Sequence, residues 1–151
     1  MPKTKIPLQK APPVEARKER AGKEVSAMGW IEDACGRVLM VKQKAGRKLW
    51  ALPGGKVRLK ESLRDALVRE IKEETGMKVW LAKPCAFYDR HEKGNLTVLF
   101  RVSVRDGNPR AVGGNEIESV AFRANPPRNS TPSLKYFWSE QRPPLLNKPP
   151  G

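Results

Sequence analysis

Hydrophobic positions along the chain follow two periods, and the change between them separates a helix from the strands around it. Between residues 62 and 76 the spacing is about 3.6, which places Leu63, Ala66, Leu67 and Ile71 in one sector of a helical projection. Shorter runs rich in aliphatic and aromatic residues predict strands. These runs are 25–31, 37–43, 48–52, 79–89, 96–105 and 117–122. The pattern predicts strands on both sides of one amphipathic helix.

Local signals mark where the helices begin and end. Ser62 is a suitable N-cap for the amphipathic helix, and Gly76 can adopt the left-handed conformation that ends it. A second helix is expected from Pro132 to about Gln141 with Thr131 as its cap, because proline is favoured in a first helical turn. Both helices are therefore predicted from short-range chemistry as well as from periodicity.

Three glutamates interrupt the apolar side of the first helix near its end. Glu70 and Glu74 project into the sector of the core residues, and Glu73 lies at its edge. Like charges three or four residues apart repel by roughly 0.2–0.5 kcal/mol per pair even when exposed, and the cost grows as water is withdrawn. A hard divalent cation such as Mg²⁺ removes this conflict because it prefers carboxylate and carbonyl oxygens. The glutamates therefore indicate a metal site.

A turn without side chains precedes this helix. The run Leu52-Pro53-Gly54-Gly55 ends a short apolar segment, and its two glycines let the backbone approach a phosphate or a metal ion closely. We expect a loop, helix and loop that together form one site.

The same segment resembles the Nudix box of the MutT-like diphosphate hydrolases. That box has the spacing G-x5-E-x7-R-E-aliphatic-x-E-E-x-G-aliphatic, and the chain matches it without a gap. The matching residues are Gly55, Glu61, Arg69, Glu70, Ile71, Glu73, Glu74, Gly76 and Met77. The wider resemblance covers about 25–122. It implies an α/β fold, a Nudix-type α/β/α sandwich with a central mixed sheet.

The resemblance also implies roles for the residues of the box. Arg69 would orient a catalytic glutamate through a salt bridge, and its i,i+4 spacing to Glu73 suits that role. Glu61 would mainly bridge to the box rather than bind metal. The implied metal ligands are Glu70, Glu73 and Glu74, assisted by the carbonyl of Gly54 or Gly55. The implied ion is Mg²⁺, with Mn²⁺ as a substitute, and no organic cofactor is expected.

A later acidic loop is expected to complete the site. Glu116 and Glu118 are the two candidates, and Glu116 is preferred because it lies in the Gly-rich segment ahead of the strand that begins near residue 117. Either residue can instead be a solvated loop acid. His91, the single histidine, lies near a predicted hairpin tip, where an exposed and non-catalytic role is favoured.

Composition limits the remaining classes of protein. One domain is expected at 151 residues, and two cysteines do not make a disulfide framework. No apolar run is long enough for a signal peptide or a membrane span, so a cytoplasmic location is the default. Residues 1–24 and 125–151 carry +4 and +3 of the +14 net charge and eleven of the fourteen prolines. We expect extended basic tails at 1–24 and 142–151 around a domain at 25–141.

The reaction that these features favour is metal-dependent hydrolysis of a phosphoanhydride bond. A nucleoside triphosphate is the preferred small-molecule substrate, with a nucleoside monophosphate and pyrophosphate as products, and a basic surface suits a polyanion. Two alternatives remain: processing of RNA 5′ ends, with the basic tails following the RNA backbone, and a non-enzymatic nucleotide sensor. Side chains that could contact substrate are Trp30, Trp50, Trp80, Phe87, Tyr88 and Trp138 by stacking, and Lys42, Lys44, Arg47 and Lys48 through phosphates. A core role is more common for the aromatic residues, and a solvated strand edge is as common for the four cations.

Overall fold

The computed structural model describes residues 22–112, 114 and 116–144. Most of the predicted N-terminal tail and residues 145–151 of the predicted C-terminal tail lie outside this part. Lys23, inside the predicted tail, forms an ion pair with Asp89 at 2.9 Å, and Glu24 opens the first strand. The folded region thus begins at least one residue earlier than the sequence indicates.

A four-stranded mixed sheet forms the centre of the molecule. Its strand order is β4-β1-β6-β5, with β1 at Glu24–Ile31, β4 at Gly54–Lys56, β5 at Lys78–Arg90 and β6 at Asn95–Asp106. β1 and β6 run parallel over the whole length of β1, whereas β4 and β5 pair antiparallel with their neighbours. A short 3₁₀ turn, η1 (His91–Lys93), joins β5 to β6. The predicted mixed sheet is confirmed.

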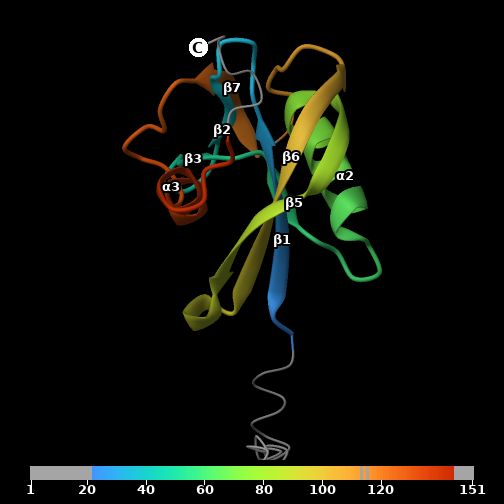
Figure 1. Cartoon of the computed structure of the whole chain (residues 1–151), viewed down its shortest axis with the longest axis vertical. Helices are drawn as coiled ribbons and strands as arrows, with labels where there is room; N and C mark the ends of the chain where they lie inside the picture. The colour runs from blue at the N-terminus through green and yellow to red at the C-terminus, as the bar shows by residue number, and fades with distance from the viewer. Residues whose placement is uncertain (1–21, 113, 115, 145–151) are drawn as a thin grey trace, which may run out of the picture.

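Three further strands form a second, antiparallel sheet at one end of the first. Its order is β3-β2-β7, with β2 at Val38–Gln43, β3 at Trp50–Ala51 and β7 at Ile117–Arg123. In Figure 1 this sheet lies above α3 and to one side of the long strands. The end of β2 and the start of β7 lie near β4, the short strand that contains the diglycine.

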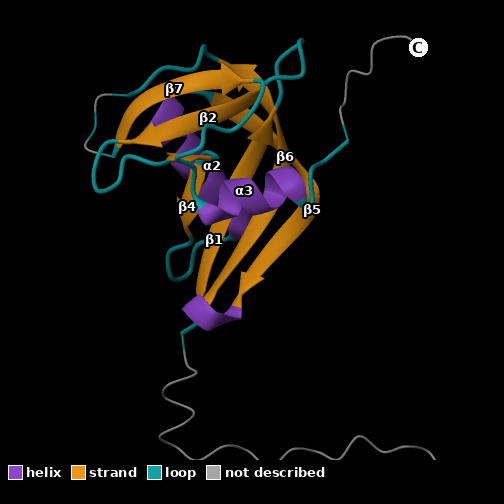
Figure 2. Cartoon of the chain, turned by 90° about the vertical axis from the view of Figure 1, so that its left-hand side faces the viewer, coloured by secondary structure: helices purple, strands orange, loops and turns teal. Residues whose placement is uncertain are grey.

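One helix covers each face of the central sheet. α2 (Leu63–Thr75) lies on one side and α3 (Pro132–Ser139) on the other, as Figures 1 and 2 show from two directions. The Ser62 hydroxyl accepts a hydrogen bond from the Asp65 amide at 3.0 Å, and Gly76 ends the helix with a φ of 75°. The predicted sandwich and both caps of the first helix are confirmed. Within the described part of the chain, no helix is long and apolar enough to cross a membrane.

Alternation along the central strands creates two cores. Ala27 and Ile31 of β1 pack towards α2, while the intervening Trp30 packs towards α3. All three side chains are fully buried. Gly29 lies beneath α2, where an added Cβ would be 3.2 Å from Cδ1 of Ile71, so its missing side chain lets the helix approach the sheet. α2 therefore packs closely against β1, the strand that pairs with β4.

Three predicted segments differ from the structure by more than a one-residue shift of a strand end. The segment predicted to be only a turn at the diglycine continues into β4, which pairs with Ser26 to Met28 of β1. The strand predicted at 48–52 contains only Trp50 and Ala51, because Lys48 adopts a left-handed conformation with φ 51°. The last helix ends at Ser139 instead of about residue 141. Each difference depends on tertiary pairing or on backbone conformation that side-chain patterns do not encode.

Candidate active site

A pocket of about 730 Å³ opens where the last turns of α2 meet β4, the end of β2 and the start of β7. Both sheets contribute to its walls, together with the loop that joins β4 to α2. The lining residues are Gln43, Ala45, Gly46, Gly54, Gly55, Lys56, Arg58, Glu70, Glu74, Glu116 and Ile117. The predicted diglycine and three of the predicted carboxylates therefore face one space.

Glu74 forms the most buried wall of this pocket, with 7% of its surface exposed. The Gly54 amide donates a hydrogen bond of 2.8 Å to Oε1 of Glu74. Burial raises the pKa of Glu74 to about 8, the Gly54 amide opposes this shift, and the charges of Glu70 and Glu116 add to it. The carboxyl group is thus held next to the glycine strand in surroundings that disfavour its negative charge.

Glu70 lies directly against the second glycine. A Cβ added to Gly55 would be 2.7 Å from Cδ of Glu70, a distance that side-chain carbons essentially never reach. Glycine is therefore required for the carboxylate to rest on the strand. Burial raises the pKa of Glu70, and the hydrogen bond from Arg69 opposes that shift. Glu70 and Glu74 approach β4 from successive turns of α2.

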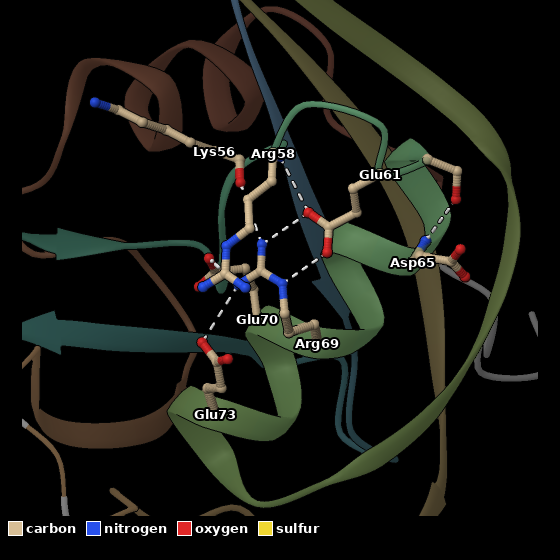
Figure 3. Close-up of polar contacts among 8 residues, drawn as sticks. Lys56, Arg58, Glu61, Asp65, Arg69, Glu70 and Glu73 are labelled. Carbon is tan, nitrogen blue, oxygen red and sulfur yellow. Dashed lines mark hydrogen bonds and ion pairs between the residues drawn. The ribbon is translucent and has the colours of Figure 1, made fainter.

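Arg69 joins the helix to the loop before it. Its Nε and Nη2 donate to the two carboxylate oxygens of Glu61 at 2.7 and 2.9 Å, and its Nη1 donates to Glu70 at 2.9 Å (Figure 3). The predicted contact with Glu73 is present but longer, at 3.4 Å. These bonds lower the pKa of Glu61 to about 2 and raise the pKa of Arg69. The bridging role of Glu61 thus has a direct geometric basis.

The two loop acids have different surroundings. Glu116 lines the pocket, and its carbonyl accepts a hydrogen bond of 2.8 Å from the Lys44 amide. Glu118 lies within β7, where its carboxylate pairs with Lys42 at 3.5 Å and Lys48 at 3.7 Å. Of the two candidates, Glu116 alone is among the lining residues of this pocket, and Lys42 and Lys48, two of the four cations expected near phosphates, pair with Glu118.

The predicted metal ligands share a region without forming a closed cluster. The side chain of Glu73 is 52% exposed and does not line the pocket. Over residues 22–112, 114 and 116–144, no three His, Cys, Asp or Glu side chains converge as a metal-binding group. Glu70 and Glu73 both accept from Arg69, whereas Glu74 accepts from Gly54, so the three carboxylates do not share one partner. Their oxygen donors still suit a hard cation.

The family model of the NUDIX domain matches residues 22–143, which is most of the chain. This protein belongs to the NUDIX domain family. The match extends from just before β1 to just past α3, so it includes both sheets and the pocket between them.

Similar proteins of this family include two curated relatives and a solved structure. The chain is 40% identical over 77 residues to a putative 8-oxo-dGTP diphosphatase of Bacillus subtilis, covering 51% of each protein. It is 31% identical over 102 residues to an ADP-ribose pyrophosphatase of Methanocaldococcus jannaschii, covering 64% of this chain and 59% of that protein. A MutT NUDIX hydrolase from Burkholderia pseudomallei is 27% identical with a TM-score of 0.57, covering 74% of this chain and 92% of that chain. The chain thus spans just over half of each curated relative.

Two cations of this NUDIX domain were missed as pocket residues by sequence reasoning. Lys56, the last residue of β4, and Arg58, in the loop that follows it, both line the pocket. The signal that could have identified them is position, since both lie between the diglycine and Glu61 inside the matched motif. Charge alone was not enough, because the chain contains thirty lysine and arginine residues.

The aromatic residues proposed to stack on a substrate base lie elsewhere in the NUDIX domain. None of the described pocket-lining residues is aromatic. Trp30 is buried beneath α3, Tyr88 stacks on Tyr136 with ring centroids 3.9 Å apart, and Trp80 is 60% exposed. His91 has a side chain that is 83% exposed at the hairpin tip. The expected stacking of these rings on a ligand in this pocket therefore has no support from their described positions.

Proposed function

We propose that the protein hydrolyses a phosphoanhydride bond in nucleoside diphosphate derivatives with the help of a divalent cation. The preferred substrate in this proposal is a nucleoside triphosphate, which gives a nucleoside monophosphate and pyrophosphate. The observation that carries the proposal is the meeting of Glu70, Glu74 and Glu116 with the glycine strand in one pocket.

The donor set supports Mg²⁺ as the cation, because every candidate ligand offers a hard oxygen atom. Two carboxylates come from the inner side of α2, one from its outer side and one from the loop before β7. A glycine carbonyl of β4 is a further donor. The residues assigned to hold the metal are Glu70, Glu73, Glu74 and Glu116, with Gly54 or Gly55.

A bound cation neutralises phosphate oxygens and makes a coordinated water more acidic. The other requirements fall to this chain. Arg69 positions Glu70 through an ion pair of 2.9 Å, and this ion pair must break before Glu70 can move. The group that accepts the proton from water is assigned to Glu70, Glu74 or Glu116, the three carboxylates that line the pocket. Variants of these residues distinguish between the three assignments.

The choice of substrate rests on chemistry that the relatives share. An 8-oxo-dGTP diphosphatase and an ADP-ribose pyrophosphatase, as the two curated relatives are named, both act on a nucleoside diphosphate unit. A pocket of about 730 Å³ is within the usual range for small-molecule sites. The positive net charge of the chain favours the arrival of a polyanion.

The test is turnover of a substrate panel by the purified full-length chain with Mg²⁺ or Mn²⁺. The panel contains nucleoside triphosphates, oxidised dGTP, ADP-ribose and a 5′-triphosphorylated RNA, with product identification. We expect monophosphate and pyrophosphate from a triphosphate. Turnover of RNA alone would replace the preferred substrate, and no turnover of any member would favour the nucleotide-sensing alternative.

The matched variants are Glu74→Gln, Glu73→Gln and Glu118→Gln. Loss of a carboxylate ligand removes several kcal/mol of charge stabilisation, so we expect the first two to lower kcat by about 10³-fold or more. Glu118→Gln removes a similar charge outside the pocket and should retain activity. Activity equal to the wild type in both helix variants would contradict the proposed metal site.

A further inference from the structure

Lys56 at the end of β4 and Arg58 in the loop that follows it bring two cations to the pocket, and only Lys56 forms an ion pair. Lys56 pairs with Glu24 at 3.1 Å. The guanidinium of Arg58 makes no ion pair or hydrogen bond with any residue in the described ranges. In Figure 3 its side chain extends from the loop towards the carboxylate end of α2. Arg58 is thus an unpaired cation at the edge of an acidic pocket.

The backbone at Arg58 is held firmly although the side chain is not. Its amide donates to Oε1 of Glu61 at 3.1 Å, and its carbonyl accepts from the Glu61 amide at 3.0 Å. One residue earlier, the Val57 amide donates to the carbonyl of Val25 in β1 at 2.8 Å. Because Glu61 also binds Arg69, the position of Arg58 is tied to the helix that carries Glu70. The backbone thus fixes where the Arg58 side chain starts beside the pocket, while its guanidinium remains available for a ligand.

The carboxylates of Glu61, Glu70 and Glu74 already have partners. Arg69 takes both oxygens of Glu61 and one oxygen of Glu70, and Glu74 accepts from Gly54. Besides the hydrogen bonds from Arg69, the charge of Arg58 helps to lower the pKa of Glu61, but its guanidinium makes no hydrogen bond to these three carboxylates, and the like charges of Arg58 and Arg69 repel each other. The chemical complement of Arg58 is therefore an anion that enters the pocket from outside.

We propose that Arg58 binds the terminal phosphate of the substrate and so makes the site selective for nucleoside triphosphates over diphosphates whose second phosphate is esterified to a sugar. This inference rests on the proposed function. A terminal phosphate presents three acceptor oxygens and close to two negative charges, which match the planar fork of arginine. An esterified inner phosphate has one oxygen and one charge fewer, so it gains less from the same contact.

Lys60 provides a matched control in the same loop. It carries the same charge two residues further on but does not line the pocket. Its backbone is left-handed with φ 67°, a conformation that asparagine tolerates better than most residues. Lys60→Asn therefore removes one positive charge from the loop with little added strain.

The experiment measures the affinity of the full-length chain for the α,β-methylene analogues of dGTP and ADP-ribose, and KM for the two parent compounds. We expect Arg58→Ala to weaken binding of the triphosphate analogue about tenfold and that of the ADP-ribose analogue less than threefold. Arg58→Lys should restore part of the loss, because it keeps the charge without the fork. Lys60→Asn should change neither affinity.

The outcome is decided by the ratio of the two losses in Arg58→Ala. A ratio below three, or an equal effect of Lys60→Asn, overturns the inference even if the wild type is an active hydrolase. A ratio of three or more with no turnover by the wild type overturns the proposed function and leaves the phosphate contact standing. Circular dichroism of each variant checks that the fold is intact.

Discussion

Arg69 and Glu61 form a two-point ion pair, Nε to Oε2 at 2.7 Å and Nη2 to Oε1 at 2.9 Å, across the junction between the loop and α2 (Figure 3). The side chains are 19% and 17% exposed, so water screens the pair only in part. Through Glu61 the same pair holds the backbone of Arg58, and through Arg69 it reaches Glu70. This one ion pair thereby positions both Arg58 in the loop and Glu70 on α2, which line the pocket from two elements.

The stability contributed by this ion pair should depend on acidity. Hydrogen bonds from Arg69 lower the pKa of Glu61 from 4.5 to about 2, so between these values the unfolded chain binds more protons than the folded chain. The contribution is therefore complete above about pH 4.5 and disappears as the pH falls through 2. We expect the difference in Tm between wild type and Glu61→Gln to narrow steadily from pH 5 to pH 2.5. A constant difference across that range would show that the ion pair does not stabilise the fold.

Glu116 and Glu118 should differ in their effect on catalysis. Glu116 lines the pocket. Glu118 lies on β7 and pairs with Lys42 of β2 and with Lys48, which precedes β3. We expect Glu116→Gln to lower kcat at least tenfold and Glu118→Gln to lower it less than threefold. Steady-state kinetics on the best substrate of the panel measures both. The reverse order would move the loop ligand to Glu118.

Gly55→Ala should disturb the site more than the fold. The new Cβ would be 2.7 Å from Cδ of Glu70, so the Glu70 side chain must move away from β4. The backbone of Gly55 does not have a positive φ, so alanine adds no backbone strain there. We expect a loss of activity of about tenfold or more, with a Tm within a few degrees of the wild type. Unfolding of the variant, or unchanged kinetics, would contradict this close contact. Gly94→Ala is the comparison variant. A Cβ added to Gly94 would meet no atom within 4 Å apart from its chain neighbours, so this variant tests an alanine in a left-handed turn far from the site.

Leu67→Ala should damage folding and leave chemistry intact. Leu67 is fully buried on the side of α2 that packs against the central sheet, so truncation leaves a cavity. We expect the free energy of unfolding to fall by about 2–5 kcal/mol, measured by urea titration. Val68 on the same helix is 39% exposed, and Val68→Ala should cost much less. Loss of kcat in the fraction of Leu67→Ala that remains folded would assign Leu67 an unforeseen role in the site.

The parts of the fold that were predictable are those encoded by neighbouring residues. The caps at Ser62 and Gly76 act within one turn of the helix, and the burial of Glu74 follows from its angular position among core residues. Strand β4 was missed because Gly54 and Gly55 carry no side chains and therefore show no alternation. Its existence depends on β1, which lies more than twenty residues away in sequence.

The candidate site was predictable to the same extent. The motif identified Glu70 and Glu74 because its spacing follows the turn of a helix, and the choice of Glu116 followed from the predicted start of β7. Arg58 was missed, because its charge is one of thirty in the chain and only its position between the diglycine and Glu61 marks it out. The preference of Arg69 for Glu61 over Glu73 was not predictable, since eight residues separate the first pair and the intervening loop sets their distance.

The walls of the pocket come from two separate sheets, with Gly54 and Gly55 on one and Gln43 and Ile117 on the other. A molecule that fills the pocket contacts both sheets. It therefore adds a link between two sheets that otherwise pack together through only part of the core. Binding confined to the folded state raises the melting temperature, by an amount equivalent to about 2.7 kcal/mol at a hundred times the dissociation constant. Thermal-shift screening of metabolite collections can therefore reveal natural ligands of this chain without any assay of turnover.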